Sequence, residues 1–391
     1  MNNFKILNKN IGINSDTYFI ADIAANHDGD IQKAKELIYS CAEAGADAAK
    51  FQNFHARTIV SDHGFKSLKG SKSHQSKWKK SVYDTYKDAE LPLEWSEEMK
   101  DTCEKAGVHY LTSPYSPEII DSVSQYVSAW KIGSGDITWH DAIVQMAKTN
   151  KPVILATGAS TIDDVRMAVK VATNNTSKFA LLQCNTNYTA QPDEQRDVAL
   201  SRMESINLKV LGLYAREFPD IVLGLSDHTI GQTTAVAAVG LFDARIIEKH
   251  YTLDNSLPGP DHGFSMNPKT WRKMVDSIRN VEKLIKTNWS YEDRLKAISP
   301  YIDIEELNAA MGDGVKRIES NESDTVILQR RGICASNELS AGHIITKDDL
   351  TPLRPQLKGA FLPYQLDKVI GRTLRCGKSF GETIYIKDFE L

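Results

Sequence analysis

Two short segments, at 224–231 (GLSDHTIG) and 245–251 (RIIEKHY), each begin apolar and end in a polar cluster that contains a histidine. The stretch between them is rich in alanine and valine, which predicts a packed helix between two strands. Polar side chains at the carboxyl ends of parallel strands meet at one edge of a sheet. His228 and His250 would lie there on neighbouring strand tips, where two imidazoles can hold one divalent cation. The alternative is that each histidine merely caps a strand or fills the core.

Other predicted strands also end in side chains that could bind a ligand. Side chains alternate along a strand, so Lys50 shares a face with Gln52, and Glu248 shares a face with His250. A lysine in a strand could equally reach the surface or pair with a carboxylate. The polar residues at or near the predicted strand ends are Asp22, Lys50, Ser113, Ser134, Thr157, Asn185, His228 and His250.

The elements that must position these side chains alternate between strand and helix patterns from residue 18 to residue 285. Eight such units predict a (β/α)8 TIM barrel. A doubly wound open sheet is the rival fold, but the chain lacks a glycine-rich dinucleotide turn. We expect Thr161 to cap the helix that follows the fifth strand. The predicted strands cover 18–24, 48–54, 109–115, 129–136, 152–158, 179–185, 221–228 and 244–251.

The chain divides into three predicted parts: a barrel over 1–285, a linker over 286–325 and a small β-rich module over 326–391. The middle stretch is charged and weakly patterned, which is typical of a linker, and strand-like sequence (TVIL) resumes at Thr325. A long polar insertion at 57–90 follows the second strand. Insertions of this length after a barrel strand indicate a lid over the barrel mouth.

Composition narrows the classes of protein. Of the 391 residues, 41% are hydrophobic and 25% are charged, which is ordinary for a soluble enzyme. The net charge of −4 and the lack of a basic block argue against nucleic-acid binding. No apolar run approaches the roughly 20 residues that span a bilayer, and residues 1–10 lack the apolar core of a signal peptide. Five scattered cysteines make no disulfide framework, so the expected location is the cytoplasm.

Six motifs run through the barrel region in order: IADIAANHDG at 20–29, KFQ at 50–52, WKIGSGD at 130–136, LSDHT at 225–229, IEKHY at 247–251 and GPDHGFSMN at 259–267. The module at the end of the chain carries RRGICA at 330–335 and AGHIITKDDL at 341–350. The first set resembles the sialic acid (N-acetylneuraminate) synthase family, and the second resembles that family's antifreeze-like (SAF) domain. The resemblance implies a TIM barrel followed by a SAF domain. It also implies an enzyme that condenses phosphoenolpyruvate with an N-acylated aldose to a nine-carbon 2-keto-3-deoxy acid and phosphate, using a divalent cation.

The resemblance implies a role for each matching residue. His228 and His250 match the family's metal ligands, for Mn²⁺ or alternatively Mg²⁺ or Co²⁺. Together with Asp22, which matches a catalytic glutamate of the family, they form the expected catalytic set. The positions implied for phosphoenolpyruvate are Lys50, Ser113, Lys131, Ser134 and Ser226. Those implied for the sugar are Gln52, Tyr188, Asp261 and, from the tail, Arg331.

The sequence departs from the family pattern at several of these positions. Asp22 is one methylene shorter than the usual glutamate, and Ala156 replaces the usual serine of the fifth-strand motif. The sixth strand ends in QCNTNYT at 183–189 rather than in Tyr-Pro, so either Asn185 or the residue after it could face the ligand. The tail reads LRPQLK at 353–358 and lacks a glycine-rich step after Arg-Pro. These changes affect the identity of the sugar more than the type of reaction.

Assembly and substrate leave alternatives open. The resemblance implies a homodimer in which the tail of one subunit closes the barrel of the other, with Arg331, or else Arg330, reaching the sugar. Related enzymes act on the di-N-acylated hexose precursors of legionaminic or pseudaminic acid, and either substrate is an alternative. A metal-dependent barrel aldolase would not explain the tail. A sugar-binding or ice-binding protein that uses the tail would not explain the polar strand ends.

Overall fold

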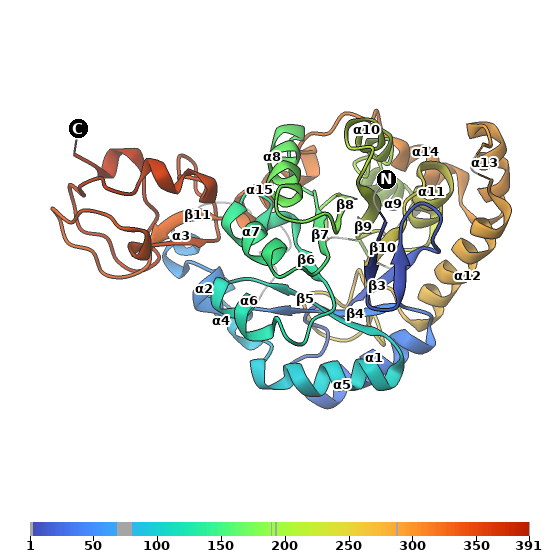
Figure 1. Cartoon of the computed structure of the whole chain (residues 1–391), viewed down its shortest axis with the longest axis horizontal. Helices are drawn as coiled ribbons and strands as arrows, with labels where there is room; N and C mark the ends of the chain where they lie inside the picture. The colour runs from blue at the N-terminus through green and yellow to red at the C-terminus, as the bar shows by residue number, and fades with distance from the viewer. Residues whose placement is uncertain (1–2, 69–79, 189, 192–193, 287, 391) are drawn as a thin grey trace.

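A closed barrel of eight parallel strands organises the residues that this computed structural model describes, 3–68, 80–188, 190–191, 194–286 and 288–390 (Figure 1). Consecutive strands are neighbours, and β10 closes the ring between β9 and β3. The closed parallel order confirms the predicted (β/α)8 barrel and excludes the open sheet. The strands are β3 Tyr18–Asp22, β4 Ala48–Asn53, β5 His109–Pro114, β6 Trp130–Ile132, β7 Val153–Ala156, β8 Phe179–Cys184, β9 Val222–Asp227 and β10 Ile246–His250.

Helices cover the outside of the barrel because each buries an apolar face against the strands. The helix α8 begins where it was predicted: the Thr161 hydroxyl accepts a hydrogen bond from the Asp164 amide, and the Asp164 carboxylate accepts one from the Thr161 amide. The single helix expected between the sixth and seventh strands is two helices, α9 and α10. The outer helices are α1 Ile31–Glu43, α5 Ser96–Ala106, α6 Pro117–Val123, α7 His140–Lys148, α8 Ile162–Thr173, α9 Arg196–Met203, α10 Val210–Glu217, α11 Thr233–Phe242 and α12 Pro268–Leu284.

The interior of the barrel is apolar at the amino ends of the strands. Inward-facing side chains there, such as Ile20 and Ile154, form one buried cluster. A hairpin of β1 (Phe4–Ile6) and β2 (Lys9–Ile11) adds its own apolar side chains to the same cluster, so it closes the barrel floor. The polar sequence at 1–10 did not predict this hairpin. Because the hairpin covers the amino end of the barrel, the described residues leave the carboxyl end open to a ligand.

The described part of the insertion after β4 forms three short α-helices, α2 (Ala56–Ile59), α3 (Asp62–Ser67) and α4 (Val82–Asp88). They surround a small apolar cluster of their own, which includes Phe54 and Phe65. Residues 69–79 of the predicted lid lie outside the described residues. The described part of the insertion packs beside the barrel mouth, as a lid requires.

The stretch predicted to be a linker is largely helical and packs against the barrel. Its helices α13 (Tyr291–Ile298) and α14 (Ile304–Met311) contribute Ile298, Leu307 and Met311 to the barrel core. The apolar residues of this stretch are few and lie among charged ones, so the sequence pattern alone did not show that they pack against the barrel. The strand predicted at Thr325 is also wrong, because the TVIL sequence lies in a helix, α15 (Ser323–Gln329). The domain boundaries at 285 and 325 stay predictions.

The tail is a small β-rich unit at the left of Figure 1, with its own apolar core. Its β11 (Gly332–Ala335) pairs antiparallel with β12 (Leu350–Leu353). The Arg354 amide donates to the Ile59 carbonyl at 2.8 Å, and the Ser61 amide donates to the Arg354 carbonyl at 2.7 Å. The tail therefore docks on the α2 region of its own chain.

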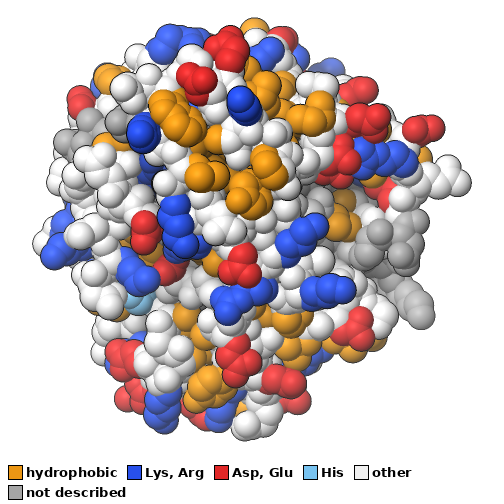
Figure 2. All heavy atoms as spheres, turned by 90° about the vertical axis from the view of Figure 1, so that its right-hand side faces the viewer, with side chains coloured by type: hydrophobic (Ala, Val, Ile, Leu, Met, Phe, Trp, Pro, Cys, Tyr) orange, Lys and Arg blue, Asp and Glu red, His pale blue; other side chains and the backbone are white. Residues whose placement is uncertain are grey.

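The surface carries charges of both signs. On the face over α12 and α13, Lys and Arg side chains are interspersed with Asp and Glu, and hydrophobic side chains gather in the upper half of the view (Figure 2). None of the helices in the described ranges is long and apolar enough to cross a membrane. Four cysteines are buried and free, whereas Cys376, in the tail, is exposed.

Candidate active site

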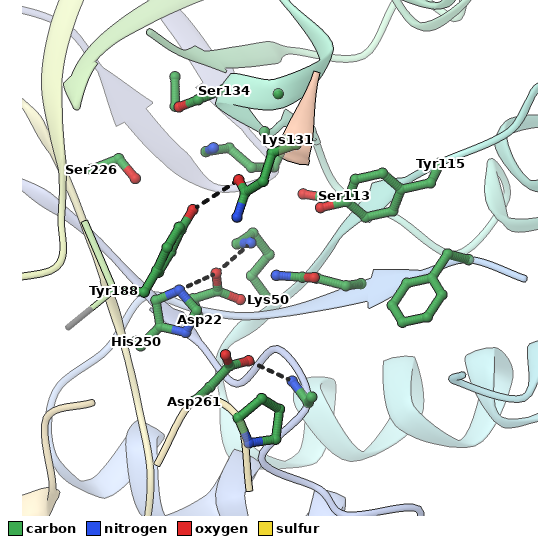
Figure 3. Close-up of a pocket in the computed structure, with 18 of the residues that line it drawn as sticks. Asp22, Lys50, Ser113, Tyr115, Lys131, Ser134, Tyr188, Ser226, His250 and Asp261 are labelled. Carbon is green, nitrogen blue, oxygen red and sulfur yellow. Dashed lines mark hydrogen bonds and ion pairs between the residues drawn. The ribbon is translucent and has the colours of Figure 1, made fainter. Parts of the chain in front are cut away.

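A pocket lies at the carboxyl end of the barrel, where the inward-facing tips of the strands meet (Figure 3). Because side chains alternate along a strand, the inward row that is apolar at the barrel floor becomes polar here. The pocket brings together every site residue predicted from the sequence except Arg331. These residues are Asp22, Lys50, Gln52, Ser113, Lys131, Ser134, Tyr188, Ser226, His228, His250 and Asp261.

Four charged side chains, those of Asp22, Lys50, Lys131 and Glu248, form a buried cluster on one side of the pocket. Figure 3 labels Asp22, Lys50 and Lys131. The Lys50 ammonium lies 2.8 Å from the Asp22 carboxylate and 3.2 Å from that of Glu248. The Lys131 ammonium lies 3.2 Å from the other oxygen of Glu248. Burial alone would raise the pKa of Glu248, but the two ammonium groups lower it to about 2. Both lysines pair with carboxylates, so an anionic ligand that enters the pocket would compete with these carboxylates for the two side chains.

The pKa of Asp22 is shifted in the opposite direction from that of Glu248. Burial raises the pKa of Asp22, Lys50 lowers it in part, and the nearby Glu248 carboxylate raises it further. Its carboxylate also lies 3.5 Å from Nε2 of His250. Asp22 is therefore placed to exchange a proton at the centre of the pocket. The shorter side chain still reaches Lys50 directly, despite its departure from the family's glutamate.

The two histidines face each other across the pocket, with ring centroids 5.4 Å apart. Nδ1 of His228 lies 2.8 Å from the Asn185 carbonyl, so Nδ1 carries the proton and Nε2 keeps its lone pair for a ligand. Nδ1 of His250 is buried without a hydrogen-bond partner among the described residues. Burial lowers the pKa of His228 to about 4 and that of His250 to about 3, which keeps both rings neutral.

These features fit a divalent cation, because a metal binds the neutral imidazole through a free ring nitrogen. The described residues contain no group of three or more His, Cys, Asp and Glu side chains that could enclose a metal. A cation held by the imidazoles of His228 and His250 alone would keep positions open for water or a substrate oxygen. Open positions are typical of catalytic rather than structural metal sites.

The serine side chains lie near the lysines. The Ser134 hydroxyl lies in the pocket wall and accepts a hydrogen bond from the Gly158 amide at 2.9 Å. The Ser113 hydroxyl is buried and has no partner among the residues that the structure describes. An orphaned buried hydroxyl is costly unless a ligand satisfies it. Ala156 also lines the pocket, so the methyl group leaves this wall one donor short of the family's serine.

The opposite side of the pocket is aromatic and acidic. Tyr188 packs on His228 with ring centroids 4.3 Å apart, and Phe264 lies 4.9 Å from His250. Asp261 accepts a 3.4 Å hydrogen bond from the Ala25 amide. Burial, and then repulsion by a second carboxylate, raise the pKa of Asp261 to about 7. This side offers hydrogen-bonding groups against aromatic rings, an arrangement that suits a sugar.

The structure does not place Arg331 in the pocket. Its side chain is buried, donates to Asp136 at 2.6 Å and lies against Trp139. Arg354 of the tail lines the pocket instead, with Nη1 3.3 Å from the Tyr86 hydroxyl. The resemblance implied Arg331, or else Arg330, for the contact with the sugar, and the Arg354-Pro step stood out only as a departure from the family pattern. The exchange of tails between two subunits stays a prediction; in the described chain, Arg354 reaches the pocket of its own barrel.

The sequence also missed several neutral residues of the pocket wall. The described part of the insertion contributes Thr85, Tyr86 and Ala89, and the helix before the tail contributes Gln329. The predicted lid therefore has residues on the pocket. These residues carry no charge or motif, so only the tertiary arrangement could identify them.

Comparisons with known proteins bear on the family of the chain. The family model described as NeuB family matches residues 37–289, and that of the SAF domain matches residues 330–390. The Bacillus subtilis spore coat polysaccharide biosynthesis protein SpsE is 32% identical over 91% of this chain and 88% of its own length. The Legionella pneumophila N,N'-diacetyllegionaminic acid synthase is 32% identical over 95% of this chain and 94% of its own.

Solved structures show the same likeness. The crystal structure of the Bacillus subtilis SpsE protein has a TM-score of 0.75 and 28% identity, with 100% of this chain and 99% of that chain covered. The N-acetylneuraminic acid synthetase of Leptospira borgpetersenii has a TM-score of 0.62 and 25% identity, over 75% of this chain and 95% of that one. The chain therefore belongs to the NeuB family, whose barrel it joins to a C-terminal SAF domain.

Proposed function

We propose that this protein is a nonulosonic acid synthase, a transferase that condenses phosphoenolpyruvate with an N-acylated aldose. The product is a nine-carbon 2-keto-3-deoxy sugar acid, and phosphate leaves by cleavage of its C–O bond. The observation that carries the proposal is that one pocket contains both two buried lysines, which share the Glu248 carboxylate, and two neutral histidines. Because both substrates are metabolites of the cell interior, the proposal places the enzyme in the cytoplasm.

Phosphoenolpyruvate would bind on the lysine side of the pocket. It carries a phosphate and a carboxylate, and Lys50 and Lys131 offer one cation to each. The anionic groups of the ligand would then compete with Glu248 for ion pairs with both lysines. The Ser113, Ser134 and Ser226 hydroxyls supply neutral donors to the remaining oxygens. The proposal thus explains why two ammonium groups are buried beside a pocket.

The aldose would bind with its aldehyde oxygen toward His228 and His250. These two residues would hold a divalent cation, Mn²⁺ in this proposal with Mg²⁺ or Co²⁺ as alternatives, which supplies Lewis-acid polarisation of a carbonyl when bound. The methylene carbon of phosphoenolpyruvate bonds to the aldehyde carbon, whose oxygen takes the proton of a protonated Asp22, the carboxyl whose pKa burial raises. Water then adds to the cationic second carbon and gives one proton to Asp22. Collapse of this adduct forms the ketone and expels phosphate.

The sugar would lie against Gln52, Tyr188 and Asp261, with Arg354 above it in place of Arg331. An N-acetylmannosamine-like substrate is the first choice. A di-N-acylated hexose is the alternative, and the similarity to a legionaminic acid synthase from Legionella pneumophila supports it. A sugar-binding protein without catalysis would need no metal-binding histidines or buried lysine pair.

Phosphate release tests the function. Purified protein should release phosphate from phosphoenolpyruvate only when a divalent cation and an N-acylated aldose are both present. A panel of mono- and di-N-acylated hexosamines identifies the aldose. Lys131→Met should lower the rate by about 10²-fold or more, since it removes a charge that faces the ligand. Lys148→Met, on the exposed side of α7, is the matched control and should keep the wild-type rate. Phosphate release without any aldose would refute the condensation.

We also propose a homodimer in which the tails are exchanged, so that the contacts of Arg354 are made to the partner barrel. Mixing inactive His250→Ala with inactive Arg354→Ala subunits should then restore activity. Half of the dimers are mixed after random exchange and each has one intact site, so about a quarter of all sites recover. A tail that stays on its own barrel predicts no recovery at any ratio. Subunit exchange is checked separately with two differently tagged chains.

A further inference from the structure

A buried carboxylate lies outside the pocket, in the stretch that joins the barrel to the tail. Glu322 ends the turn η5 (Ser320–Glu322) and has no solvent exposure. One carboxylate oxygen accepts hydrogen bonds from the Ala159 amide at 2.7 Å, the Thr186 amide at 2.7 Å and the Thr186 hydroxyl at 3.0 Å. The other oxygen accepts from the Glu319 amide at 3.1 Å. A buried charge is stable only when its hydrogen bonds are satisfied in this way.

Glu322 thereby joins the loops that follow β7 and β8. These loops are already close, because a side chain at Gly158 would lie 2.4 Å from Thr186. Residues beside Glu322 add to the same contact. The side-chain amides of Asn321 and Asn185 each donate one hydrogen bond to the other at 3.0 Å. The Thr325 hydroxyl donates to the Thr186 carbonyl at 3.2 Å.

The loop after β8 leads directly to the histidine pair. Asn185 precedes Thr186, and its carbonyl accepts the hydrogen bond from Nδ1 of His228 at 2.8 Å. That bond sets which nitrogen of His228 is free and how the ring is turned. Two of the three hydrogen bonds to one oxygen of Glu322 come from Thr186, so the carboxylate fixes the peptide that carries this acceptor.

We propose that Glu322 is a positioning residue that holds the end of β8 so that the Asn185 carbonyl orients His228 for metal binding. The inference rests on the proposed role of His228 as a metal ligand. It assigns part of the metal affinity to the stretch between barrel and tail, which makes no contact with the metal. Removal of a group that supports a metal ligand typically weakens metal binding by about 10- to 100-fold.

Direct metal binding tests this role without relying on turnover. Mn²⁺ is titrated into full-length, metal-stripped protein and free Mn²⁺ is followed by electron paramagnetic resonance. Glu322→Ala should raise the Kd for Mn²⁺ by about 10-fold, the lower end of the range, because the effect passes through Thr186 and Asn185. Glu322→Gln, with its oxygen toward both loops, should stay close to wild type. Glu292→Gln removes an exposed carboxylate on α13, in the same stretch but away from Glu322, and it should leave Kd unchanged.

Two further readouts separate positioning from general destabilisation. Amide hydrogen exchange at Ala159 and Thr186 should accelerate in Glu322→Ala, since both amides lose their acceptor. The variant's rate should recover at saturating Mn²⁺. If Glu322→Ala does not fold, Glu322→Asp decides, because its carboxylate is one methylene too short to reach both loops.

The possible failures are distinguishable. Wild-type protein that binds no Mn²⁺ would overturn the proposed histidine metal site, and this inference with it. Wild-type protein that binds Mn²⁺, together with a folded Glu322→Ala or Glu322→Asp of equal affinity, would overturn the positioning role alone.

Discussion

Lys249 and Asp227, which directly precede His250 and His228 in the sequence, form a buried ion pair that should contribute to stability. The Lys249 ammonium lies 2.6 Å from the Asp227 carboxylate, and each side chain is only 1% exposed. Asp227 also accepts hydrogen bonds from the Thr229 amide at 3.0 Å, the Thr229 hydroxyl at 2.8 Å and the Thr234 hydroxyl at 2.5 Å. The perturbation is Lys249→Met, which keeps most of the side-chain length and removes the charge.

Removing one partner of a buried pair typically lowers the free energy of unfolding by about 3–5 kcal/mol, because the other charge is left buried and unpaired. Three hydrogen bonds remain on Asp227, so we expect the lower end, about 3 kcal/mol. The double variant Asp227→Asn with Lys249→Met leaves no unpaired charge. We expect it to lose only about 1–2 kcal/mol, which is the scale of lost hydrogen bonds.

The sign of the pH dependence follows from Asp227. Burial alone would raise its pKa, but Lys249 and the hydrogen bonds lower it below the ordinary value. Its contribution to stability is therefore present above the unfolded pKa of about 3.9 and is lost as the pH falls through the lower folded value. In Lys249→Met the carboxyl can protonate to relieve the unpaired charge. The stability gap between wild type and variant should thus narrow as the pH falls from 7 to 4.

Urea unfolding of the metal-free proteins, followed by fluorescence of the buried Trp130 and Trp271, measures these differences in the barrel. The double variant separates the charge effect from the loss of packing. A Lys249→Met protein that loses less than about 1 kcal/mol, or a double variant at least as unstable as Lys249→Met, would refute the reasoning.

Three further predictions concern the pocket. Chelation should abolish activity and Mn²⁺, Mg²⁺ or Co²⁺ should restore it, whereas His250→Ala should bind no metal; full activity in metal-stripped His250→Ala protein would contradict the assignment. Asp22→Asn should fold normally and lose about 10²-fold or more in rate if this carboxyl exchanges a proton, and wild-type rates would remove that role. Asp261→Asn should be more stable than wild type at pH 8 and nearly equal to it at pH 4. Because the pKa of Asp261 in the folded protein is raised to about 7, the wild-type protein loses stability as the pH rises through that value. A stability difference between wild type and variant that stays constant from pH 4 to 8 would disprove this.

The sequence predicted the barrel from local periodicity, and it predicted most of the pocket from the resemblance to the synthase family. A strand's two-residue repeat places Lys50 with Gln52 and Glu248 with His250 on one face each, whereas the roles of the other pocket residues were implied by the resemblance. The identity of the tail arginine does not follow from such a pattern. Arg331 and Arg354 lie on the two paired strands of the tail or beside them, and only the docking of the tail decides which one reaches the pocket.

The same distinction explains the other differences. The TVIL sequence at 325–328 has β-branched residues that favour a strand, yet Glu322 and Thr325 tie this stretch to the barrel loops as a helix. In α14 the acidic Glu305 and Glu306 directly precede the residues that meet the barrel, Leu307, Ala310 and Met311, so the sequence alone resembles a linker. Tertiary contacts outweigh local preference in both places, and local preference is all that a single sequence provides.

The distribution of thiols makes this chain a ready subject for site-selective labelling. Burial raises the pKa of the Cys41, Cys184 and Cys334 thiols to about 12, and Cys103 is buried as well. A maleimide reagent applied to the native protein should therefore attach to Cys376 alone, since it reacts with exposed thiolates. A fluorophore placed there reports on the tail without any engineered cysteine. Each additional label that appears in urea then counts a buried thiol that has become exposed, three of them in the barrel and one in the tail.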